Sequence, residues 1–142
     1  MKIPKRDFIK NEEILFMGYS SRKDSFSRMV YKEFIKAGIT VYPVNPQKSE
    51  HYDIKVFNSI SEIEKVPETA YILMKKENVE QAFSEIKDSG VKRILFQNKN
   101  LVTEEILDEC EDKGIKAVTA CPMMLIGGGF HKIHRFFAGL SN

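Results

Sequence analysis

The stretch Ile14-Leu15-Phe16-Met17-Gly18-Tyr19-Ser20 decides the fold of this 142-residue chain. A short apolar run that stops at Gly-x-Ser and leads into a serine-rich helix start is typical of a strand, a tight turn and a helix. In that geometry the loop backbone and the helix N-terminus direct free N–H groups at one spot, which suits a diphosphate. We expect Gly18 to let the backbone approach such a group closely, so that Gly18→Val would abolish binding in a folded protein.

Outward from this stretch, strands and helices alternate along the chain. Apolar runs predict strands over 13–18, 39–44, 70–74, 91–96 and 115–120, with a weaker strand over 54–58. Apolar residues at helical spacing predict helices between them, and glycines mark the helix ends at Gly38, Gly90 and Gly114. Residues 61–64 have the Ser-x-x-Glu order of a capped helical turn, and a final helix is expected after the three glycines at 127–129.

This alternation predicts the fold class. Strands that are joined through helices cannot pair as hairpins, and they form a parallel sheet with right-handed crossovers. We therefore expect one α/β domain over residues 1–142, a three-layer, Rossmann-like, doubly wound parallel sheet of five or six strands.

Composition narrows the function classes. The chain is 42% hydrophobic and 30% charged, as ordinary globular proteins are. Its net charge of +2 does not favour nucleic acid as a partner. Neither a secretory signal nor an apolar run of the ~20 residues that a membrane helix needs is evident. With two cysteines only, a reduced cytoplasmic protein is the expectation.

Ligands of open parallel sheets bind beyond the carboxyl ends of the strands. The segments expected at that edge are 18–22, 45–48, 75–78, 97–100 and 121–123, which are rich in amides and basic side chains. Glu77 is the one acidic residue among them, so an anionic ligand is favoured. Ser25 or Ser27 is expected to cap the following helix, and Ser20 offers a hydroxyl donor. The usual three-glycine fingerprint is absent, and strand-to-helix turns that bind no ligand also carry glycine and serine.

The chain also resembles a known family. The residues that carry the resemblance are Gly18-x-Ser20, Ser27-x-x-Val30, the run Val41-Tyr42-Pro43-Val44-Asn45-Pro46, Gly90-Val91-Lys92, Gln97, Gly114-Ile115 and Cys121-Pro122-Met123. They look like those of the stand-alone bacterial and archaeal CoA-binding proteins, which are single Rossmann-like domains similar to the CoA-binding domain of succinyl-CoA synthetase. The chain departs from that pattern at Tyr19, Lys75-Lys76 and Asn98-Lys99-Asn100.

The resemblance implies where the parts of coenzyme A lie. It places the diphosphate on Gly18, Tyr19, Ser20 and Ser27, and the nucleotide end beside Asn45, Pro46 and Lys48. We expect Arg22 and Ser25 to border the diphosphate, and Lys75, Gln97 and Asn98 to border the adenine or the pantetheine. The resulting prediction is a protein that binds coenzyme A or an acyl-CoA and has no catalytic activity of its own.

The residues after the second strand agree with such a ligand. Asn45-Pro46-Gln47-Lys48 stands where a site that grips a bare ribose usually has Asp or Glu. A carboxylate there would oppose the 3′-phosphate of coenzyme A at a cost of ~1 kcal/mol or more. The same substitution permits NADP and argues against NAD. Two alternatives therefore remain: an NADP-binding module or small reductase, and a ligand-free interaction protein on the same fold.

The remaining candidates favour structure over chemistry. His131 and His134 lie three apart on the expected last helix without an acidic neighbour, so no metal site is predicted. The stripe Phe130, Ile133, Phe136 and Phe137 is typical of a core or of a homodimer contact. Cys121, at the edge, is interpreted as a packed strand-end thiol rather than a partner for a pantetheine disulfide, and Cys110 as core. The expected edge offers no nucleophile with a base beside it.

Overall fold

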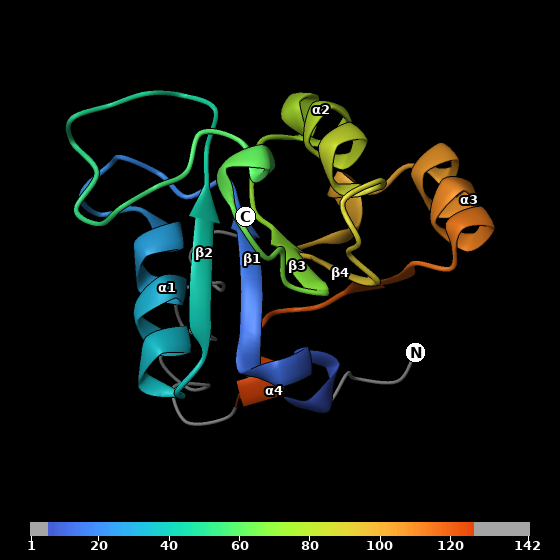
Figure 1. Ribbon diagram of the computed structural model, residues 1–142, viewed down its shortest axis with the longest axis horizontal. Helices are drawn as coiled ribbons and strands as arrows, with labels where there is room; N and C mark the ends of the chain where they lie inside the picture. The colour runs from blue at the N-terminus through green and yellow to red at the C-terminus, as the bar shows by residue number, and fades with distance from the viewer. Residues whose placement is uncertain (1–5, 127–142) are drawn as a thin grey trace.

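The protein is a three-layer α/β domain, and the computed structural model describes residues 6–126 (Figure 1). Its strands are β1 (Glu13–Met17), β2 (Thr40–Val44), β3 (Thr69–Ile72), β4 (Arg93–Phe96) and β5 (Lys116–Thr119). Its helices are α1 (Phe26–Lys36), α2 (Lys76–Ile86), α3 (Glu104–Lys113) and α4 (Met123–Ile126). Short 3-10 segments cover Arg6–Phe8, Lys10–Glu12, Ile60–Glu62 and Lys99–Leu101. The helix expected after residue 127 lies outside the described residues.

The five strands form one parallel sheet in the order β2-β1-β3-β4-β5. This confirms the predicted doubly wound, Rossmann-like class. The chain winds from β1 to β2 on one side and then crosses back to place β3 on the other side of β1. Strand order therefore reverses between β1 and β3.

Residues of β1 alternate between two cores, one on each face of the sheet. Ile14 and Phe16 pack with α1 and α4, whereas Leu15 and Met17 pack with α2 and α3. Figure 1 shows α1 on one side of the sheet and α2 with α3 on the other. Full burial of each such side chain contributes roughly 1.5–3 kcal/mol, so the apolar run fixes the strand between two helical layers.

The weak strand predicted over 54–58 is reduced to a single bridge. Phe57 pairs with Val44 on the outer edge of β2: its N–H donates to Pro43 O and its carbonyl accepts from Asn45 N, each at 2.9 Å. Extending this ladder backward needs a donor on residue 43, and proline has none. Pro43 therefore ends the sixth strand after one residue without weakening the pairing of β2 with β1, since its carbonyl faces outward.

Helix termini follow the sequence with two differences, the first being that α2 ends at Ile86 and not at the expected Gly90. Ser25 caps α1 by accepting from Arg28 N, and Thr103 caps α3 by accepting from Ile106 N. Gly114 ends α3 in the left-handed conformation at φ 71°. The predicted turn at 61–64 is instead the 3-10 segment Ile60–Glu62, whose capping side chain is Ser59.

Candidate functional site

The carboxyl edge of the sheet at β1 is where the candidate site lies. Here the loop after β1 leads to α1 on one face, whereas the segment after β3 leads to α2 on the other face. In open parallel sheets a ligand binds where neighbouring connections diverge in this way. The sequence-predicted residues 18–27, 45–48, 75, 97 and 98 all follow the carboxyl ends of strands.

Gly18 is required by the packing of the protein backbone, a reason that the sequence did not indicate. Its φ is +102°, and a Cβ built there would lie 2.0 Å from Leu73 O, the carbonyl oxygen next to the end of β3. Its N–H donates to Val44 O at 2.9 Å. Any side chain at residue 18 would collide with the segment that follows β3. The packing therefore excludes the expected outcome that Gly18→Val folds normally and loses only its binding.

Some backbone N–H groups of the loop after β1 are hydrogen-bonded within the protein and others are not. Ser20 N–H donates to Ser27 Oγ at 2.9 Å, so the amides of Gly18 and Ser20 are both used within the fold. The amides of Tyr19 and Ser21 make no hydrogen bond within residues 6–126. Ser20 Oγ accepts from Arg22 N–H at 3.0 Å and keeps its own proton to donate. The side chain of Arg22 is exposed.

Ser25 and Ser27 form a buried hydroxyl pair under this loop. Their Oγ atoms lie 3.0 Å apart, and each also accepts from a backbone N–H, Ser25 from Arg28 and Ser27 from Ser20. One of the two hydroxyls donates its proton in the bond between them, and the proton of the other remains available to donate. The pair therefore links the start of α1 to the loop.

Tyr19 is fully buried, with 0% of its surface exposed. Its ring packs edge-on against Phe16 and Tyr31, and its hydroxyl donates to Asp53 Oδ1 at 2.7 Å. Burial, and then the bond to Asp53, raise the pKa of Tyr19 far above its ordinary value. The side chain therefore belongs to the core and holds Asp53 of the loop after β2.

Residues 45–48 open the loop that follows β2. Asn45 Nδ2 donates to Tyr19 O at 2.8 Å, and Asn45 Oδ1 accepts from Gln47 N–H at 2.9 Å. The side chain of Asn45 thus joins the first loop to the second. Pro46 and Lys48 are exposed beside it.

At the other half of the edge, Gln97 is buried and Lys75 and Asn98 are exposed. Tyr71 donates its hydroxyl to Gln97 Oε1. Asn98 Oδ1 accepts from Asn100 N–H at 2.9 Å and starts the segment Lys99–Leu101. Lys75 precedes α2 without a side-chain capping bond.

Cys121 lies half-buried after β5, and Cys110 is buried on α3, as expected of a core residue. Burial raises the pKa of the Cys121 thiol, although a bond to the Met123 backbone acts in the opposite direction. Thiolate is the reactive form, so this environment disfavours disulfide exchange near neutral pH.

Neither a cluster of metal-ligating side chains nor a membrane-spanning helix is found in the part of the chain that is described. Residues 6–126 bring no three of His, Cys, Asp and Glu together in the manner of a metal site. His131, His134 and the Phe130–Phe137 stripe lie outside these residues. Within the same range no helix is long and apolar enough to cross a bilayer.

The interactions that Arg28, Asp53 and Tyr71 make at this edge were not predicted from sequence. Arg28, on the first turn of α1, donates to the carbonyl oxygens of Ser20, Ser21 and His51. Asp53 accepts from Tyr19 and lies 3.5 Å from Arg28 Nε. Tyr71 bonds to Gln97. The one local signal is the position of Arg28, three residues after the capping Ser25, because a side chain in the first helical turn reaches back toward the preceding loop.

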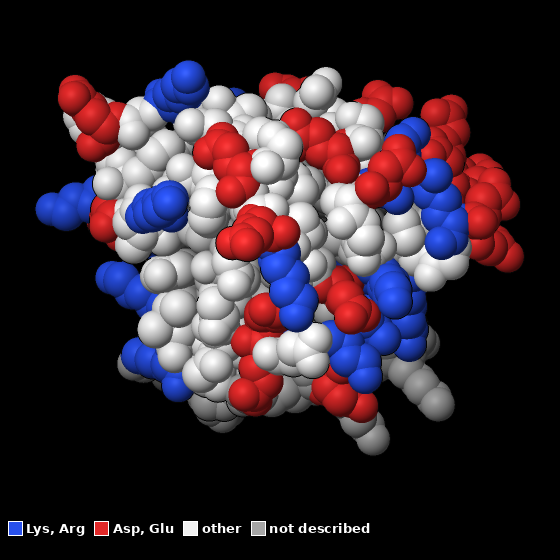
Figure 2. Space-filling model, in the orientation of Figure 1, with Lys and Arg blue, Asp and Glu red and all other residues white. Residues whose placement is uncertain are grey.

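Acidic side chains are unevenly distributed over the face of the molecule in Figure 2. They gather toward α3, at the right of the view, where a group of basic side chains lies beside and below them. Basic side chains predominate at the left, on the side of α1 and the loop after β2. The loops that follow β1 and β2 therefore lie away from the main acidic surface of this face.

Comparison with known proteins gives one family and several similar folds. The family described as CoA binding domain matches residues 12–126. The uncharacterized protein YneT of Bacillus subtilis is 27% identical over 105 residues, 74% of this chain and 77% of that protein. A conserved hypothetical protein of Pyrococcus furiosus has a similar fold, with a TM-score of 0.67 at 24% identity over 79% of this chain and 96% of that chain. An acetyl-coenzyme A synthetase of Ca. Korarchaeum cryptofilum gives 0.68 at 17% identity, over 85% of this chain and 30% of that one.

Proposed function

Because the chain belongs to the CoA binding domain family, we propose that it binds coenzyme A or an acyl-CoA at the carboxyl edge of its sheet. The observation that carries the proposal is the loop after β1. Its Tyr19 and Ser21 amides have no partner among residues 6–126, and it leads into the positive end of α1.

The diphosphate is assigned to this loop. Backbone N–H groups at a helix start recognise phosphate oxygens without a specific side chain. The Tyr19 and Ser21 amides, the Ser20 hydroxyl proton and the exposed Arg22 guanidinium supply donors and positive charge there. Ser25 and Ser27 support the site from beneath, because their paired hydroxyls hold the Ser20 amide to the helix.

The adenosine 3′-phosphate is assigned to the second loop. The segment 45–48 holds no carboxylate, and its Lys48 side chain is exposed for an ion pair. An exposed ion pair contributes up to about 1 kcal/mol, and a charge-assisted bond to phosphate more. Asn45 and Pro46 precede Lys48 in this loop, and Asn45 joins it to the loop after β1 through its bond to Tyr19 O.

The residues at the other half of the edge are assigned to the adenine or the pantetheine. Lys75, Gln97 and Asn98 border that half of the edge. We propose binding without catalysis, because no serine of residues 18–27 is bonded to a base, the Tyr19 hydroxyl that bonds to Asp53 is fully buried, and the Cys121 thiol is disfavoured as a thiolate. We place the protein in the cytoplasm on the scarcity of cysteine.

Calorimetry with coenzyme A, 3′-dephospho-coenzyme A, NADP and NAD tests the proposal. Coenzyme A is expected to bind most tightly, and dephospho-coenzyme A more weakly by about tenfold, the equivalent of one phosphate contact. A preference for NADP would favour the reductase alternative. Absence of heat, together with no thermal shift at saturating ligand, would favour the interaction protein.

Lys48→Ala sharpens the assignment of the 3′-phosphate. The variant is expected to lose about tenfold in affinity for coenzyme A and little for dephospho-coenzyme A. Lys55→Ala is the matched control, since Lys55 is exposed in the same loop and lies over the Phe57 ring. Equal losses for both ligands, or equal effects of both variants, would remove Lys48 from the site.

A further inference from the structure

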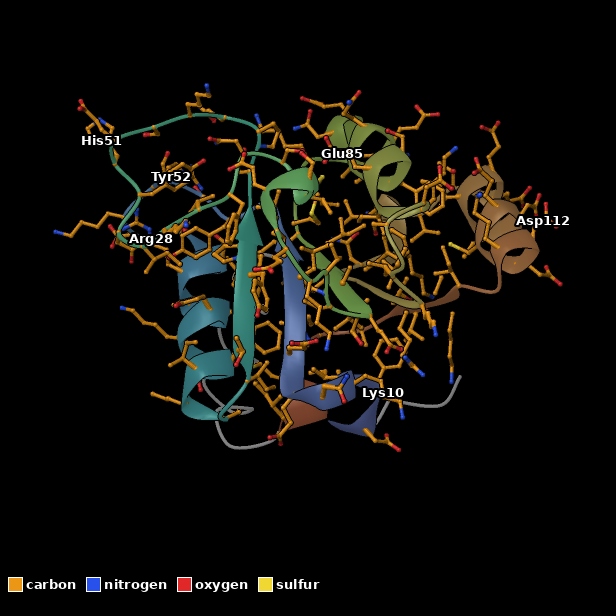
Figure 3. The ribbon with its side chains drawn as sticks, viewed as in Figure 1. Lys10, Arg28, His51, Tyr52, Glu85 and Asp112 are labelled. Atoms are coloured by element: carbon orange, nitrogen blue, oxygen red, sulfur yellow. The ribbon has the colours of Figure 1, made fainter. Side chains whose placement is uncertain are left out.

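Arg28 is a buried cation beneath the loop after β1, with 9% of its surface exposed. Its Nη2 donates to Ser21 O at 2.7 Å and to His51 O at 2.8 Å, and its Nε contacts Ser20 O at 3.4 Å. Figure 3 places Arg28 between the start of α1 and the loop that carries His51 and Tyr52. We infer that Arg28 is the positioning residue of the anion site, holding carbonyl oxygens inward so that amides face the ligand; this rests on the proposed function.

Peptide geometry explains the effect. In a trans peptide the C=O and the following N–H point in opposite directions. Because Arg28 draws Ser20 O toward the protein, the N–H of Ser21 in the same unit is directed away from Arg28. This is one of the two loop amides without a partner in residues 6–126. Without the guanidinium, the Ser20 and Ser21 carbonyls would lose their donor and be free to turn outward, where their partial negative charge repels phosphate.

Arg28 also ties the first loop to the second. The bond to His51 O and the 3.5 Å contact with Asp53 both reach the loop 45–58. Tyr19, from the first loop, donates to the same Asp53. We call Tyr19, Arg28 and Asp53 the clasp. The clasp fixes the loop that carries Lys48 relative to the amides assigned to the diphosphate.

Lysine cannot reproduce this arrangement. The guanidinium is planar and donates in fixed directions to carbonyls of two separate loops. An ammonium group at residue 28 keeps the charge but is a compact donor on a flexible stem. Arg28→Lys therefore separates the directional role from the electrostatic one, and Arg28→Met removes both.

Two variants and two matched controls test the inference. Arg28→Lys is compared with Lys32→Arg, the reverse exchange at an exposed residue one turn further along α1. Tyr19→Phe is compared with Tyr31→Phe, because Tyr31 packs against Tyr19 and its hydroxyl makes no hydrogen bond within residues 6–126. Each protein is titrated with coenzyme A and dephospho-coenzyme A, and backbone hydrogen exchange is measured without ligand.

Arg28→Lys is expected to lower the affinity for both ligands about tenfold, since both carry the diphosphate. Tyr19→Phe is expected to lower the affinity for coenzyme A more than that for dephospho-coenzyme A, because the loop that carries Lys48 is no longer held in place. It is also expected to speed backbone hydrogen exchange in residues 47–57. Exchange in β3 and β4 is expected to stay unchanged, which excludes general destabilisation. The controls are expected to match the wild type in every measurement.

The inference is overturned if Arg28→Lys binds both ligands as the wild type does, or if Tyr19→Phe leaves both the affinity ratio and the exchange of 47–57 unchanged. Failure of the proposed function has a different signature. In that case the wild type binds neither ligand, and the exchange measurement alone decides whether the clasp holds the second loop.

Discussion

The two halves of the carboxyl edge are built differently. The loops after β1 and β2 are joined by Asn45, Arg28 and the Tyr19–Asp53 bond. The segments after β3 and β4 are exposed at 75–78 and 98–100 and make mainly local bonds, such as Asn78 N–H to Lys75 O. The tied half has a fixed arrangement of donors before a ligand arrives, whereas the open half does not.

On the proposed function this difference follows the chemistry of the ligand. The phosphates are the same in coenzyme A and in every acyl-CoA, and preorganised donors avoid the entropy cost of ordering a loop on binding. The acyl group varies between ligands, and long exposed side chains such as Lys75 can change rotamer to accommodate it. The tied half is therefore the place to test affinity, and the open half the place to test selectivity.

The largest effect is expected from Gly18→Ala, which disturbs the junction of the tied half with β3. The added Cβ would lie 2.0 Å from Leu73 O, and the positive φ is unfavourable for alanine. We expect a loss of about 3–5 kcal/mol in the free energy of unfolding, measured by urea denaturation. Gly38→Ala is the control, because it shares a positive φ but has no atom within 4 Å of the added Cβ. Equal losses would mean that φ alone explains the effect.

The second-largest effect is expected at alkaline pH, where Tyr19 of the tied half releases its proton on unfolding and the stability of the folded protein should fall. The pKa of Tyr19 is raised in the folded protein above the ordinary value of 10.0, so above that pH the unfolded chain releases a proton that the native state keeps. Stability should therefore fall as the pH rises beyond about 10. Tyr19→Phe removes this linkage, and its urea midpoint should fall less steeply between pH 9 and pH 11. A parallel fall in both proteins would contradict this role of Tyr19.

A smaller effect is expected in the open half, from Lys75→Ala. The side chain is exposed and makes no hydrogen bond or ion pair within residues 6–126, so stability should change by less than about 0.5 kcal/mol. Affinity for coenzyme A should fall by a factor of ~3 or less, as measured by calorimetry. A loss as large as that of Lys48→Ala would show that the open half also contributes fixed charge to binding.

The smallest expected effect concerns Cys121. Because burial raises the pKa of its thiol, its reaction with iodoacetamide at pH 7.5 should be slower than that of a free cysteine peptide and should speed up as the pH rises. Mass spectrometry of the peptide that contains residue 121 measures the rate. Rapid alkylation at neutral pH would reveal an activated thiol and reopen disulfide exchange with pantetheine.

Most of the fold was predictable because its signals are local. The five strands, the serine cap at the start of α1 and the left-handed Gly114 at the end of α3 each depend on residues close together in the sequence. The strand predicted over 54–58 is longer than the observed one. Its length depends on Pro43, which lies in a separate strand and has no N–H to donate.

The site was predictable in outline only. Sequence order placed the polar segments at the carboxyl ends of the strands, and the structure confirms that placement. The structural need for Gly18 was not predictable, because the atom that excludes a side chain there is Leu73 O, more than fifty residues away. The partners of Tyr19, Arg28 and Gln97 likewise come from distant parts of the chain.

The sequence by itself determined the alternation of strands and helices, the parallel sheet, and a second-strand end without an acid, since periodicity, turn residues and charge are local properties. Only the tertiary structure decided which backbone amides are left without partners and which side chains hold the two loops together. Those outcomes depend on which donor finds which acceptor when 18–28 and 45–58 are packed together, and hydrogen-bond geometry is fixed only once the chain has folded.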